Sequence, residues 1–528
     1  MIVGKIGSAI AKALSELGVE GVAPILEHPS EFQNGDYSTN VALAAAKAAK
    51  KNPKALADEL VAKLMEDGLP AQAGVERIEV AGPGFINFYL TRSFFAHSVA
   101  DIVAIGKDWG KGGSLKSEKI IFEYTQPNPF KEMHIGHLVN NIVGETVSRL
   151  AEFSGALVKR ATYHGDIGLH VAKALWGIQR GRLDISDVKA QGRGYAAGSK
   201  AYEEGADAKQ EIEQINKELY AGTSPLMHLY EQGRTVALEH FKSIYERLGS
   251  RFDFNLLESE AGRAGTPLVR AHLADNIFEE SDGAVIFRGE QYGLHTRVFI
   301  NSQGLPTYEA KDLALADIKL GLFPYTRSIV VVDVEQSPYF TVVEKAIELI
   351  HSHLVGKVSH VPHGRMRLPT GRISSRLGGN LGAEQLINEI QALALEKMKD
   401  REFGDDRASV ADQIAIAAIK YQVLKQGTGK HIVYDPEKSL SFEGDSGPYL
   451  QYSHTRAVSV LAKAKAEGVA ASAALAPDNS TDLERVLYRF PEVVERATAE
   501  YEPHYVTTYL TELAGMFNSW YAVGKIVD

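Results

Sequence analysis

Residues 119–141 read KIIFEYTQPNPFKEMHIGHLVNN. The apolar run 119–124 predicts a strand, the Pro-Asn-Pro sequence at 127–129 predicts a loop, and a helix is expected to begin near His137. A strand that leads through a loop into a helix is typical of nucleotide sites, because the unpaired N–H groups and the dipole of a helix N-terminus favour phosphate. We therefore expect an α/β fold with a nucleotide site in this segment.

The chain is long enough for several domains around this segment. It has 528 residues, of which 45% are hydrophobic, and a single core usually serves far fewer. The polar, glycine-rich stretch 108–114 predicts a linker, so we place a domain boundary near residue 113. Two stretches rich in helix formers and two with strand-like alternation precede it, at 42–51, 55–64, 77–80 and 85–90. We expect a small α+β N-terminal domain over residues 1–113.

The middle of the chain, residues 114–400, is predicted to be an α/β domain. The apolar run 329–332 has the β-branched character of a strand that is buried on both faces, as in a parallel sheet. Residues 195–220 are charged and helical and fit an insertion better than a sheet. We therefore expect a helical insertion at about 178–300.

Past Asp412 the apolar residues follow helical spacing. The positions are Ile414, Ile416, Ile419 and Val423, then Val486, Leu487, Phe490, Val493 and Val494, then Val506, Tyr509, Leu510, Leu513 and Phe517. An Ala/Ser/Pro-rich stretch at 468–481 predicts an exposed connection between two of these helices. The last domain, residues 401–528, is therefore expected to be all-α.

Composition excludes several kinds of protein. The absence of cysteine rules out disulfides and thiolate metal sites, and no spaced His/Asp cluster suggests a structural metal. A net charge of −10 argues against a protein that coats nucleic acid by bulk electrostatics, although local basic patches stay compatible with it. No run of about 18 apolar residues is present, and residues 1–17 predict an amphipathic helix rather than a secretion signal. We expect a cytoplasmic protein with no membrane partner.

His134 and His137 flank Gly136 at the predicted start of the helix. Two imidazoles there could donate hydrogen bonds to phosphate oxygens, and Gly136, which has no Cβ, would let a nucleotide approach the backbone closely. Two such histidines can also be ordinary helix-cap residues, and a string of four residues does not decide between these interpretations. The surrounding sequence is needed.

That surrounding sequence resembles the first signature of arginyl-tRNA synthetases, a family of the class I enzymes with the HIGH signature. The resemblance covers residues 123–133, the two histidines and residues 138–141. Further matches occur in the family's order along almost the whole chain, at 35–40, 82–87, 306–308 with Asp312, 441–444 and 447–452.

The resemblance implies an arginine–tRNA ligase, which activates L-arginine with ATP and transfers it to the 2′-hydroxyl of the 3′-terminal adenosine of tRNA(Arg). It implies a Rossmann-like parallel-sheet core that binds ATP. The N-terminal domain would then touch the tRNA elbow, and the C-terminal helices would bind the anticodon stem and loop. Mg²⁺ is expected only as the counter-ion of ATP, no structural metal is expected, and the chain is expected to act as a monomer.

An arginine pocket can be predicted from the guanidinium group, which is planar, permanently charged and best held by carboxylates in bidentate geometry. Glu123 and Asp312 match positions that grip the guanidinium in the family, with Tyr308 beside them. Asn128 and Gln336 match positions that hold the α-amino and carboxylate end. The alternative is that the two acids are ordinary surface residues. Such a carboxylate site should reject lysine without editing.

The second class signature departs from its usual Lys-Met-Ser-Lys-Ser form. Residues 372–376 read RISSR, so Ser375 replaces the second lysine, which would stabilise the pyrophosphate leaving group. In the family a lysine just before the first signature then takes this role; Lys131 occupies that place, and Arg376 is a second candidate. We expect Ser374 and Ser375 to contact ATP. The alternative is a surface loop with two arginines.

Two further segments differ from the family pattern. Residues 164–168 resemble its Gly-Asp-x-Gly segment and are expected to shape the wall of the site, but His170 stands where glutamine is commoner. The chain ends at 523–528, where arginyl enzymes usually continue into another helix or so. The anticodon-binding domain is therefore expected to be shortened.

Two other functions stay open. One is another HIGH-class member, either a synthetase for a different amino acid or a small-molecule nucleotidyltransferase; Glu123, Tyr308 and Asp312 argue against it. The other is a non-catalytic tRNA-binding relative. The intact histidines and pocket acids argue against that function, and the short tail argues for it.

Overall fold

The computed structural model describes residues 2–69, 73–367, 382–399, 406–470, 479–524 and 526. The chain divides into two compact units. The first contains Met1–Gly110, Thr455–Glu492 and Glu512–Asp528, and the second contains Lys111–His454 and Val493–Thr511. Within the described ranges, no helix has the length and apolar character needed to cross a membrane.

A five-stranded parallel sheet is the centre of the second unit. Its strands are β4 (Lys119–Glu123), β5 (Leu157–His164), β6 (Phe254–Leu257), β10 (Arg327–Asp333) and β11 (Val358–His363). Their order is β11-β10-β4-β5-β6, and every pair is parallel. Strands β5 and β6 follow β4 on one side, and β10 and β11 are then added on the other side of β4. The strand order therefore reverses between β4 and β10. Ligands of such sheets bind at the carboxyl ends of the strands at this reversal. The predicted Rossmann-like sheet is confirmed.

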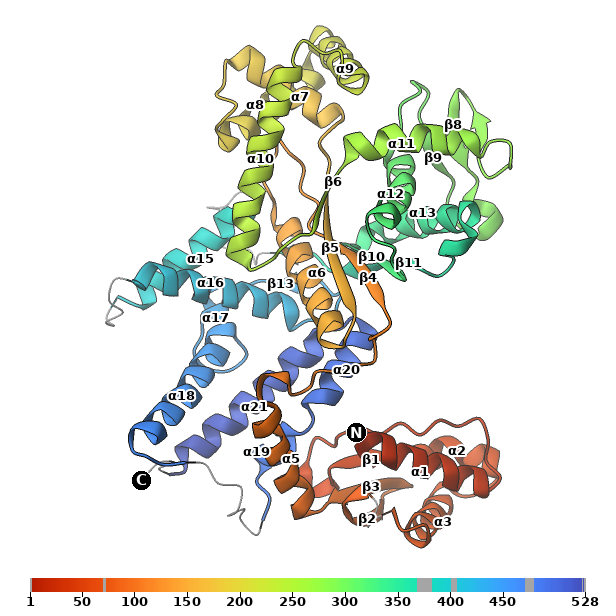
Figure 1. Cartoon of the computed structure of the whole chain (residues 1–528), viewed down its shortest axis with the longest axis vertical. Helices are drawn as coiled ribbons and strands as arrows, with labels where there is room; N and C mark the ends of the chain where they lie inside the picture. The colour runs from red at the N-terminus through yellow and green to blue at the C-terminus, as the bar shows by residue number, and fades with distance from the viewer. Residues whose placement is uncertain are drawn as a thin grey trace. The chain divides into compact units, whose positions relative to one another are not determined.

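Helices cover both faces of this sheet (Figure 1). Successive side chains of a strand point to opposite faces. Ile120 and Phe122 therefore join the core formed with α6 (Ile135–Phe153), whereas Ile121 joins the core formed with α12 (Tyr308–Leu322) and α13 (Ser337–Ile350). Helices α15 (Ala383–Lys397) and α16 (Arg407–Leu424) extend the α6 side. The arrangement buries both faces, as the run 329–332 predicted.

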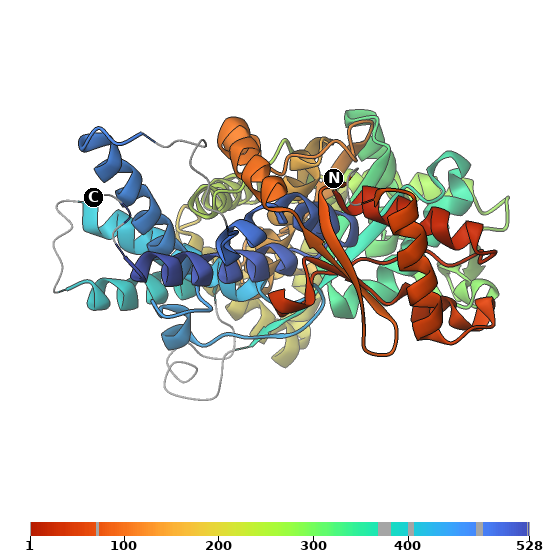
Figure 2. The ribbon, with the colours of Figure 1, turned by 90° about the horizontal axis from the view of Figure 1, so that it is seen from below.

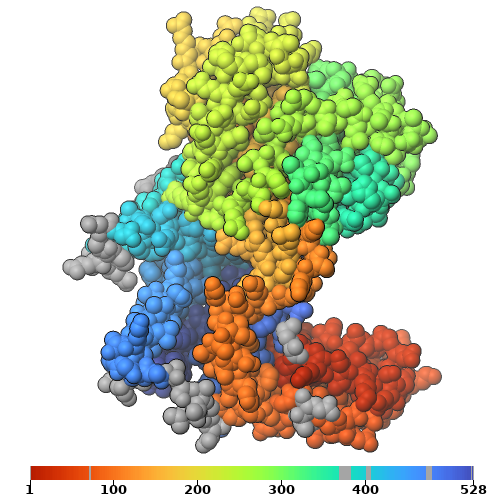
Figure 3. All heavy atoms as spheres, viewed as in Figure 1, coloured from red at the N-terminus to blue at the C-terminus, as the bar shows by residue number. Residues whose placement is uncertain are grey.

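The helical insertion is shorter than the sequence suggested. Its helices are α7 (Leu169–Gly181), α8 (Val188–Glu204), α9 (Ala206–Ala221) and α10 (Met227–Leu248), whose side chains form the yellow to yellow-green surface in Figure 3. The expected range 178–300 is corrected beyond Leu248, because it also contains β6 of the main sheet. It further contains α11 (Glu258–Ala271) and an antiparallel sheet of β7 (Glu279–Ser281), β8 (Ala284–Phe287) and β9 (Arg297–Ile300). Strands of three or four residues are too short to show alternation, and tertiary pairing sets their structure.

The N-terminal part of the first unit is an α+β layer, as predicted. Strands β1 (Tyr37–Thr39), β2 (Val75–Ala81) and β3 (Phe85–Leu90) form an antiparallel sheet of order β1-β3-β2. The helices are α1 (Ile2–Glu16), α2 (Val41–Ala49), α3 (Pro53–Glu66) and α5 (Arg92–Ile105). Helices α2 and α3 contact the sheet and α1 packs on α3, as the red and orange ribbons of Figure 2 show.

The C-terminal part of the chain, which contributes to both units, is helical, as predicted, apart from one short strand. Its helices are α17 (Pro436–Ser439), α18 (Gly447–Ala466), α19 (Asp482–Leu487), α20 (Phe490–Glu500) and α21 (His504–Ala522). The predicted helix near 486–494 is divided in two at residues 488–489. The range expected to be all-α also contains β13 (Ile432–Val433), which pairs with β12 (Met366–Arg367). A strand of two residues is too short to show a period, so this pair could not be predicted.

Within the first unit, the segment 482–492 packs against the N-terminal sheet. Arg485 Nε donates to Asp36 Oδ1 at 2.7 Å, and the Tyr37 hydroxyl donates to Glu492 Oε1 at 2.5 Å. The ring of Tyr488 belongs to the same apolar core as the N-terminal helices. The matched segment 35–40 therefore supplies buried contacts inside this unit.

Candidate active site

A large pocket lies at the carboxyl ends of β4 and β10, where the strand order reverses. Its cavity volume is about 660 Å³, within the roughly 300–1,000 Å³ of typical ligand sites. The predicted site residues that line it are Glu123, Asn128, His134, Gly136, His137, Tyr308, Asp312 and Gln336. Ser374, Ser375 and Arg376 lie outside the described residues.

The loop after β4 is held in an uncommon backbone conformation. Thr125, Gln126 and Phe130 all have positive φ, at 79°, 51° and 65°. Such conformations cost free energy in residues other than glycine and persist where surrounding contacts fix them. Asn140 Oδ1 accepts from the backbone N–H of Thr125 at 2.6 Å, and the Asn141 side-chain amide donates to the Thr125 hydroxyl at 2.9 Å. The two asparagines of α6 thus fix the loop beside the pocket.

His134 and His137 cap α6 and are both set up as hydrogen-bond donors. Nδ1 of His134 accepts from the backbone N–H of Gly136 at 3.0 Å, and Nδ1 of His137 accepts from the backbone N–H of His134 at 3.3 Å. Their rings stack with centroids 3.7 Å apart. Because each Nδ1 accepts, the proton of each neutral ring lies on Nε2. The cap and the phosphate-donor interpretations are therefore compatible.

Both histidines are held neutral near pH 7. His134 is accessible from the pocket but surrounded by protein, and this desolvation lowers its pKa, with a smaller effect of the Lys131 charge in the same direction. Burial lowers the pKa of His137 well below its usual value, and His134 and Lys131 lower it further. A Cβ on Gly136 would lie within 2.9 Å of the His134 imidazole, so glycine here leaves room for that ring.

Glu123 lies at the end of β4, only 2% exposed, and both its oxygens are already engaged. The Lys319 ammonium donates to Oε2 at 3.0 Å, and the side-chain amide of Gln126 donates to Oε1 at 2.7 Å. Glu123 is therefore no surface acid, and its charge is balanced from within the chain. Sequence reasoning missed Lys319, which lies seven residues after Asp312 on α12 and so faces the same side of that helix.

Asp312 is the acid of the pocket whose charge is least balanced. Its Oδ2 accepts from the Tyr339 hydroxyl at 2.6 Å, and no ion pair to it occurs among the described residues. Burial raises the pKa of Asp312 to about 8, and the neighbouring charges of Glu123 and Glu258 act in the same direction. Tyr308, one helical turn before Asp312, presents a ring that is 58% exposed at the pocket.

A second buried pair lies on the same wall. The Lys311 ammonium donates to Glu258 Oε2 at 2.8 Å, and both side chains are at most 7% exposed. Burial and the proximity of Asp166 raise the pKa of the Glu258 carboxyl, while Lys311 opposes this. The α12 helix thus supplies one lysine to each of two pocket carboxylates.

Of the segment 164–168, which was expected to shape the wall of the site, Gly165 lines the large pocket. Asp166 is fully buried and accepts hydrogen bonds from the Tyr230 hydroxyl and from Ser259, both at 2.8 Å. A Cβ on Gly165 would lie 2.2 Å from Asn128 Oδ1, so the absence of a side chain there lets Asn128 pack against the wall. Burial lowers the pKa of His170, which contacts the Gly165 carbonyl, to about 4.

Cations also line the large pocket and its neighbour, and of these Lys131 alone was predicted among the described residues. The Lys131 ammonium lies 4.3 Å from the ring centroid of Tyr195 and lines a neighbouring pocket that shares Asn128 with the large one. Arg365 lines the large pocket itself and is held by Asp333 and Glu335, at 2.6 Å each. No sequence pattern pointed to Arg365.

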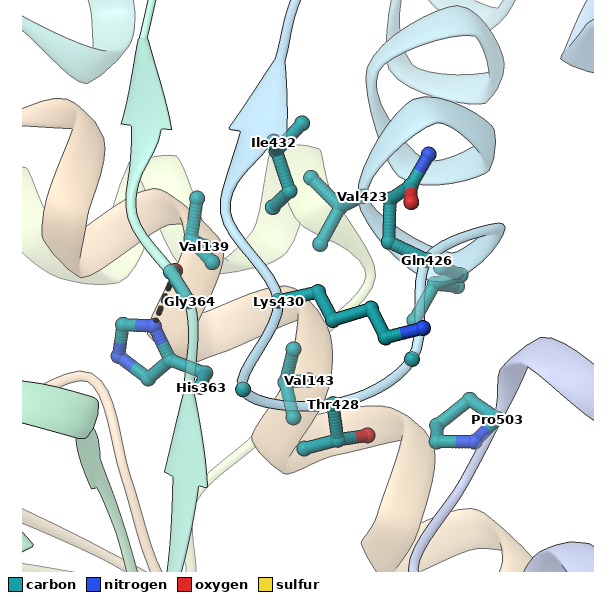
Figure 4. A pocket seen from close by; sticks show the side chains of 13 residues that line it. Val139, Val143, His363, Gly364, Val423, Gln426, Thr428, Lys430, Ile432 and Pro503 are labelled. Carbon is teal, nitrogen blue, oxygen red and sulfur yellow. Dashed lines mark hydrogen bonds between the residues drawn. The ribbon is translucent and has the colours of Figure 1, made fainter.

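A smaller pocket behind His363 contains no predicted site residue (Figure 4). Apolar side chains line it, among them Val139, Val143 and Val423, and His363 Nδ1 bonds the Gly364 carbonyl at 2.9 Å. A Cβ on Gly364 would lie 1.9 Å from the backbone oxygen of Lys430, so two backbones approach closely here. The small pocket is a packing feature of the domain.

Three family models match the chain. The model "tRNA synthetases class I (R), catalytic domain" matches residues 99–435, "Arginyl tRNA synthetase N terminal domain" matches residues 4–90, and "DALR anticodon binding domain" matches residues 450–528. Together they span most of the sequence in the order expected from the motifs.

Similar proteins carry the same description. The chain is 31% identical to an arginine–tRNA ligase of Treponema denticola, over 94% of this chain and 87% of that protein, and 29% identical to one of Shewanella halifaxensis, over 97% and 92%. Among solved structures, arginyl-tRNA synthetase of Thermus thermophilus superposes with a TM-score of 0.80 at 26% identity, over 100% of this chain and 92% of that one. The Plasmodium falciparum arginyl-tRNA synthetase has the same fold, with a TM-score of 0.81 at 18% identity, over 100% and 93%. The chain therefore belongs to the arginyl-tRNA synthetase family of class I synthetases.

Proposed function

We propose that this chain attaches L-arginine to tRNA(Arg) in two steps that use ATP. One observation carries the proposal: donors suited to phosphate and acids suited to a guanidinium line a single pocket, at the reversal point of a parallel sheet. The ends of β4 and α12 supply the acids, and the N-terminus of α6 supplies the donors. The names of the similar proteins support the same activity.

The two steps conserve atoms as follows. A carboxylate oxygen of arginine forms a bond to the α-phosphorus of ATP, the bond from that phosphorus to the β-phosphate oxygen breaks, and pyrophosphate leaves. The 2′-oxygen of the terminal adenosine of tRNA then bonds the arginyl carbonyl carbon, AMP leaves, and the hydroxyl proton is released. Catalysis of this kind depends mainly on positioning and on stabilisation of developing charge. ATP enters as its Mg²⁺ complex.

On the nucleotide side, His134 and His137 would donate from Nε2 to the phosphates, at the N-terminus of α6, whose dipole favours negative charge. Lys131 would stabilise the pyrophosphate from the adjoining pocket. Arg376, with Ser374 and Ser375, stays a sequence-based proposal for the same end of the nucleotide.

On the arginine side, Asp312 and Glu123 would receive the guanidinium, with the exposed ring of Tyr308 against the aliphatic stem. Asn128 and Gln336 would hold the α-amino and carboxylate end, which has to reach the α-phosphate. Glu123 retains one accepting position on each oxygen, because each already takes one hydrogen bond from the protein.

The finer assignments extend the same proposal. We propose that residues 1–113 contact the tRNA elbow, that residues 114–400 catalyse the reaction, and that residues 401–528 bind the anticodon stem and loop. The chain would act as a monomer in the cytoplasm.

The test is attachment of labelled arginine to total tRNA with ATP and Mg²⁺, beside labelled lysine and glutamine. Arginine alone should be attached. Charging with another amino acid would favour a different class I synthetase, and arginine binding without charging would favour a non-catalytic relative.

A variant tests the nucleotide side separately. His137→Ala should lower the single-turnover rate by about 10²–10³-fold, because one preorganised donor to developing charge is lost. Arginine binding should not change. His353→Ala is the control, since His353 is exposed and lies outside the pocket. A wild-type rate in His137→Ala would contradict the assigned role.

A further inference from the structure

Lys131 points its ammonium into the pocket that adjoins the large one. This neighbouring pocket has a cavity volume of about 470 Å³ and shares Asn128 and Tyr308 with the large pocket. Lys131 lines the neighbouring pocket but not the large one. Its ammonium forms no ion pair among the described residues. It lies instead over the face of the Tyr195 ring, 4.3 Å from the ring centroid.

The Tyr195 ring is carried by a closely packed helix. Tyr195 is half-buried on α8, which packs on α7 with the two backbones in contact. A Cβ on Gly177 of α7 would lie 2.0 Å from the backbone oxygen of Gly194, and a Cβ on Gly198 would lie 1.9 Å from that of Lys173. Helices that touch in this way have little room to shift. The ring is therefore fixed beside the ammonium.

The contact between the ring and the ammonium bears on the nucleotide. An ammonium over an aromatic face is attracted by the ring quadrupole, and the attraction grows when both groups are partly withdrawn from water, as the half-buried Lys131 and Tyr195 are. The proposed function has Lys131 stabilise the pyrophosphate end of ATP in the large pocket. Because the ammonium lines the other pocket, it has to leave the ring to reach the phosphates. Tyr195 and ATP thus compete for one cation.

We propose that Tyr195 is a positioning residue that acts through Lys131: its ring binds the ammonium in the neighbouring pocket and so lowers the affinity for ATP. This inference rests on the proposed function, because it takes Lys131 as a contact of the ATP phosphates. The free enzyme holds Lys131 on the ring, and ATP gains the charge only after the ammonium has left it. A ligand that is bound by one of two conformations loses apparent affinity when the other conformation is the more populated.

Tyr195→Leu tests this role, because it removes the aromatic face and keeps an apolar side chain that suits a helix. The dissociation constant of Mg²⁺–ATP, measured by calorimetry on the full chain without arginine or tRNA, should fall about three- to tenfold as the competing contact is lost. Tyr195→Phe keeps the ring face and should bind ATP like wild type. Tyr202→Leu is the matched control, since Tyr202 lies on the same helix, holds Lys173 at the same 4.3 Å, and lines neither pocket. It should leave ATP affinity unchanged.

The same substitution in a Lys131→Ala background separates positioning from a structural role. Without the ammonium the ring has no cation to hold, so Tyr195→Leu should no longer change ATP affinity. Damage to the pocket wall would instead weaken ATP binding in both backgrounds. If Tyr195→Leu does not fold, Tyr195→Gln gives the same test, because glutamine also suits a partly exposed helix position.

The outcomes separate this inference from the proposed function. A tighter complex in Tyr195→Leu, but no change on adding this substitution to Lys131→Ala, supports the inference. An unchanged or larger dissociation constant in Tyr195→Leu would overturn the inference alone. Wild-type ATP affinity in Lys131→Ala would overturn the inference and the assigned role of Lys131, and the charging assay would still decide whether arginine is attached to tRNA. Wild-type protein that binds no ATP would overturn both.

Discussion

Asp36 in the first unit is a buried carboxylate and Asp312 in the second is a half-buried one at the large pocket, and their charges are balanced in different ways. Asp36 is 2% exposed; Arg485 donates to one of its oxygens at 2.7 Å, and the backbone N–H of Leu90 donates to the other at 2.8 Å. Asp312 receives the neutral Tyr339 hydroxyl, and no ion pair to it occurs in the described part of the chain.

This difference separates a structural charge from a binding charge. A buried carboxylate that the protein itself neutralises contributes to the fold, whereas one without a cation keeps a raised pKa until a cation arrives. The pKa of about 8 for Asp312, caused first by burial, is the sign of such a site. Replacing each aspartate by asparagine, and measuring both stability and arginine kinetics, tests this distinction.

The largest effect is expected for Asp312→Asn. It should lower kcat/KM for arginine by about a thousandfold, because the guanidinium loses the pocket carboxylate that is not paired with a lysine of the protein. The unfolding temperature should stay the same or rise, since the surroundings that raise the pKa of Asp312 disfavour its charged form and Asn carries no charge. Steady-state charging of tRNA and a thermal melt measure the two quantities. Wild-type kcat/KM would show that Asp312 does not contact arginine.

Asp36→Asn should lower the stability of the first unit and leave the kinetics with arginine unchanged. Removing one partner of a buried ion pair leaves Arg485 unbalanced and should destabilise the first unit by about 3 kcal/mol. Hydrogen exchange of β3 amides measures this locally, which suits a chain of several domains better than a single global unfolding curve. Arginine KM should not change at temperatures where the unit stays folded. A raised KM with normal exchange would reverse the distinction between the two acids.

The pH dependence of arginine binding should follow Asp312. Since only its carboxylate pairs with a guanidinium, affinity should rise by up to about tenfold per pH unit as pH increases towards about 8, and then level off. The sign for stability is the reverse. The raised pKa means that the folded state holds a proton which the unfolded state releases above about 3.8, so stability without arginine falls as pH rises from about 4 to about 8. Calorimetry at pH 6, 7 and 8 checks the first trend, and Asp312→Asn should abolish it.

The sequence predicted those parts of the fold and site that depend on local pattern. The run 329–332 and the strand at 119–124 are long and apolar enough to define the sheet, and the helix after Pro129 begins within two residues of its predicted start. Most candidate pocket residues within the described ranges do line one pocket. The motifs and the local periodicity were sufficient for this.

Residues that matter through long-range contacts could not be predicted in this way. Lys319 contacts Glu123 across 196 positions of sequence, and Arg485 contacts Asp36 across 449. A lysine on a helix has the same local pattern whether it faces solvent or a buried carboxylate, so no signal distinguished Lys319. Strands β7, β8 and β9 were missed for a related reason, because their pairing rather than their composition fixes them.

The smallest effect is expected when two tyrosine hydroxyls, rather than two carboxylates, are compared. The Tyr37 hydroxyl donates to Glu492 at 2.5 Å inside the first unit, whereas the Tyr163 hydroxyl has no partner within the described ranges. Tyr37→Phe should therefore destabilise the first unit by about 1 kcal/mol, the usual net contribution of one hydrogen bond, and leave arginine affinity unchanged. Tyr163→Phe removes no hydrogen bond that the described residues make, so it should leave stability unchanged.

Hydrogen exchange of the first unit for Tyr37→Phe, and a thermal melt for Tyr163→Phe, measure what each hydroxyl contributes to stability. If Tyr37→Phe exchanges like wild type, its hydrogen bond to Glu492 contributes nothing measurable. The rule that a partnered group holds the fold would then apply only to the charged pair of Asp36 and Arg485. If both variants behave as expected, the presence of a protein partner marks the groups that stabilise the fold for neutral hydroxyls as well as for carboxylates.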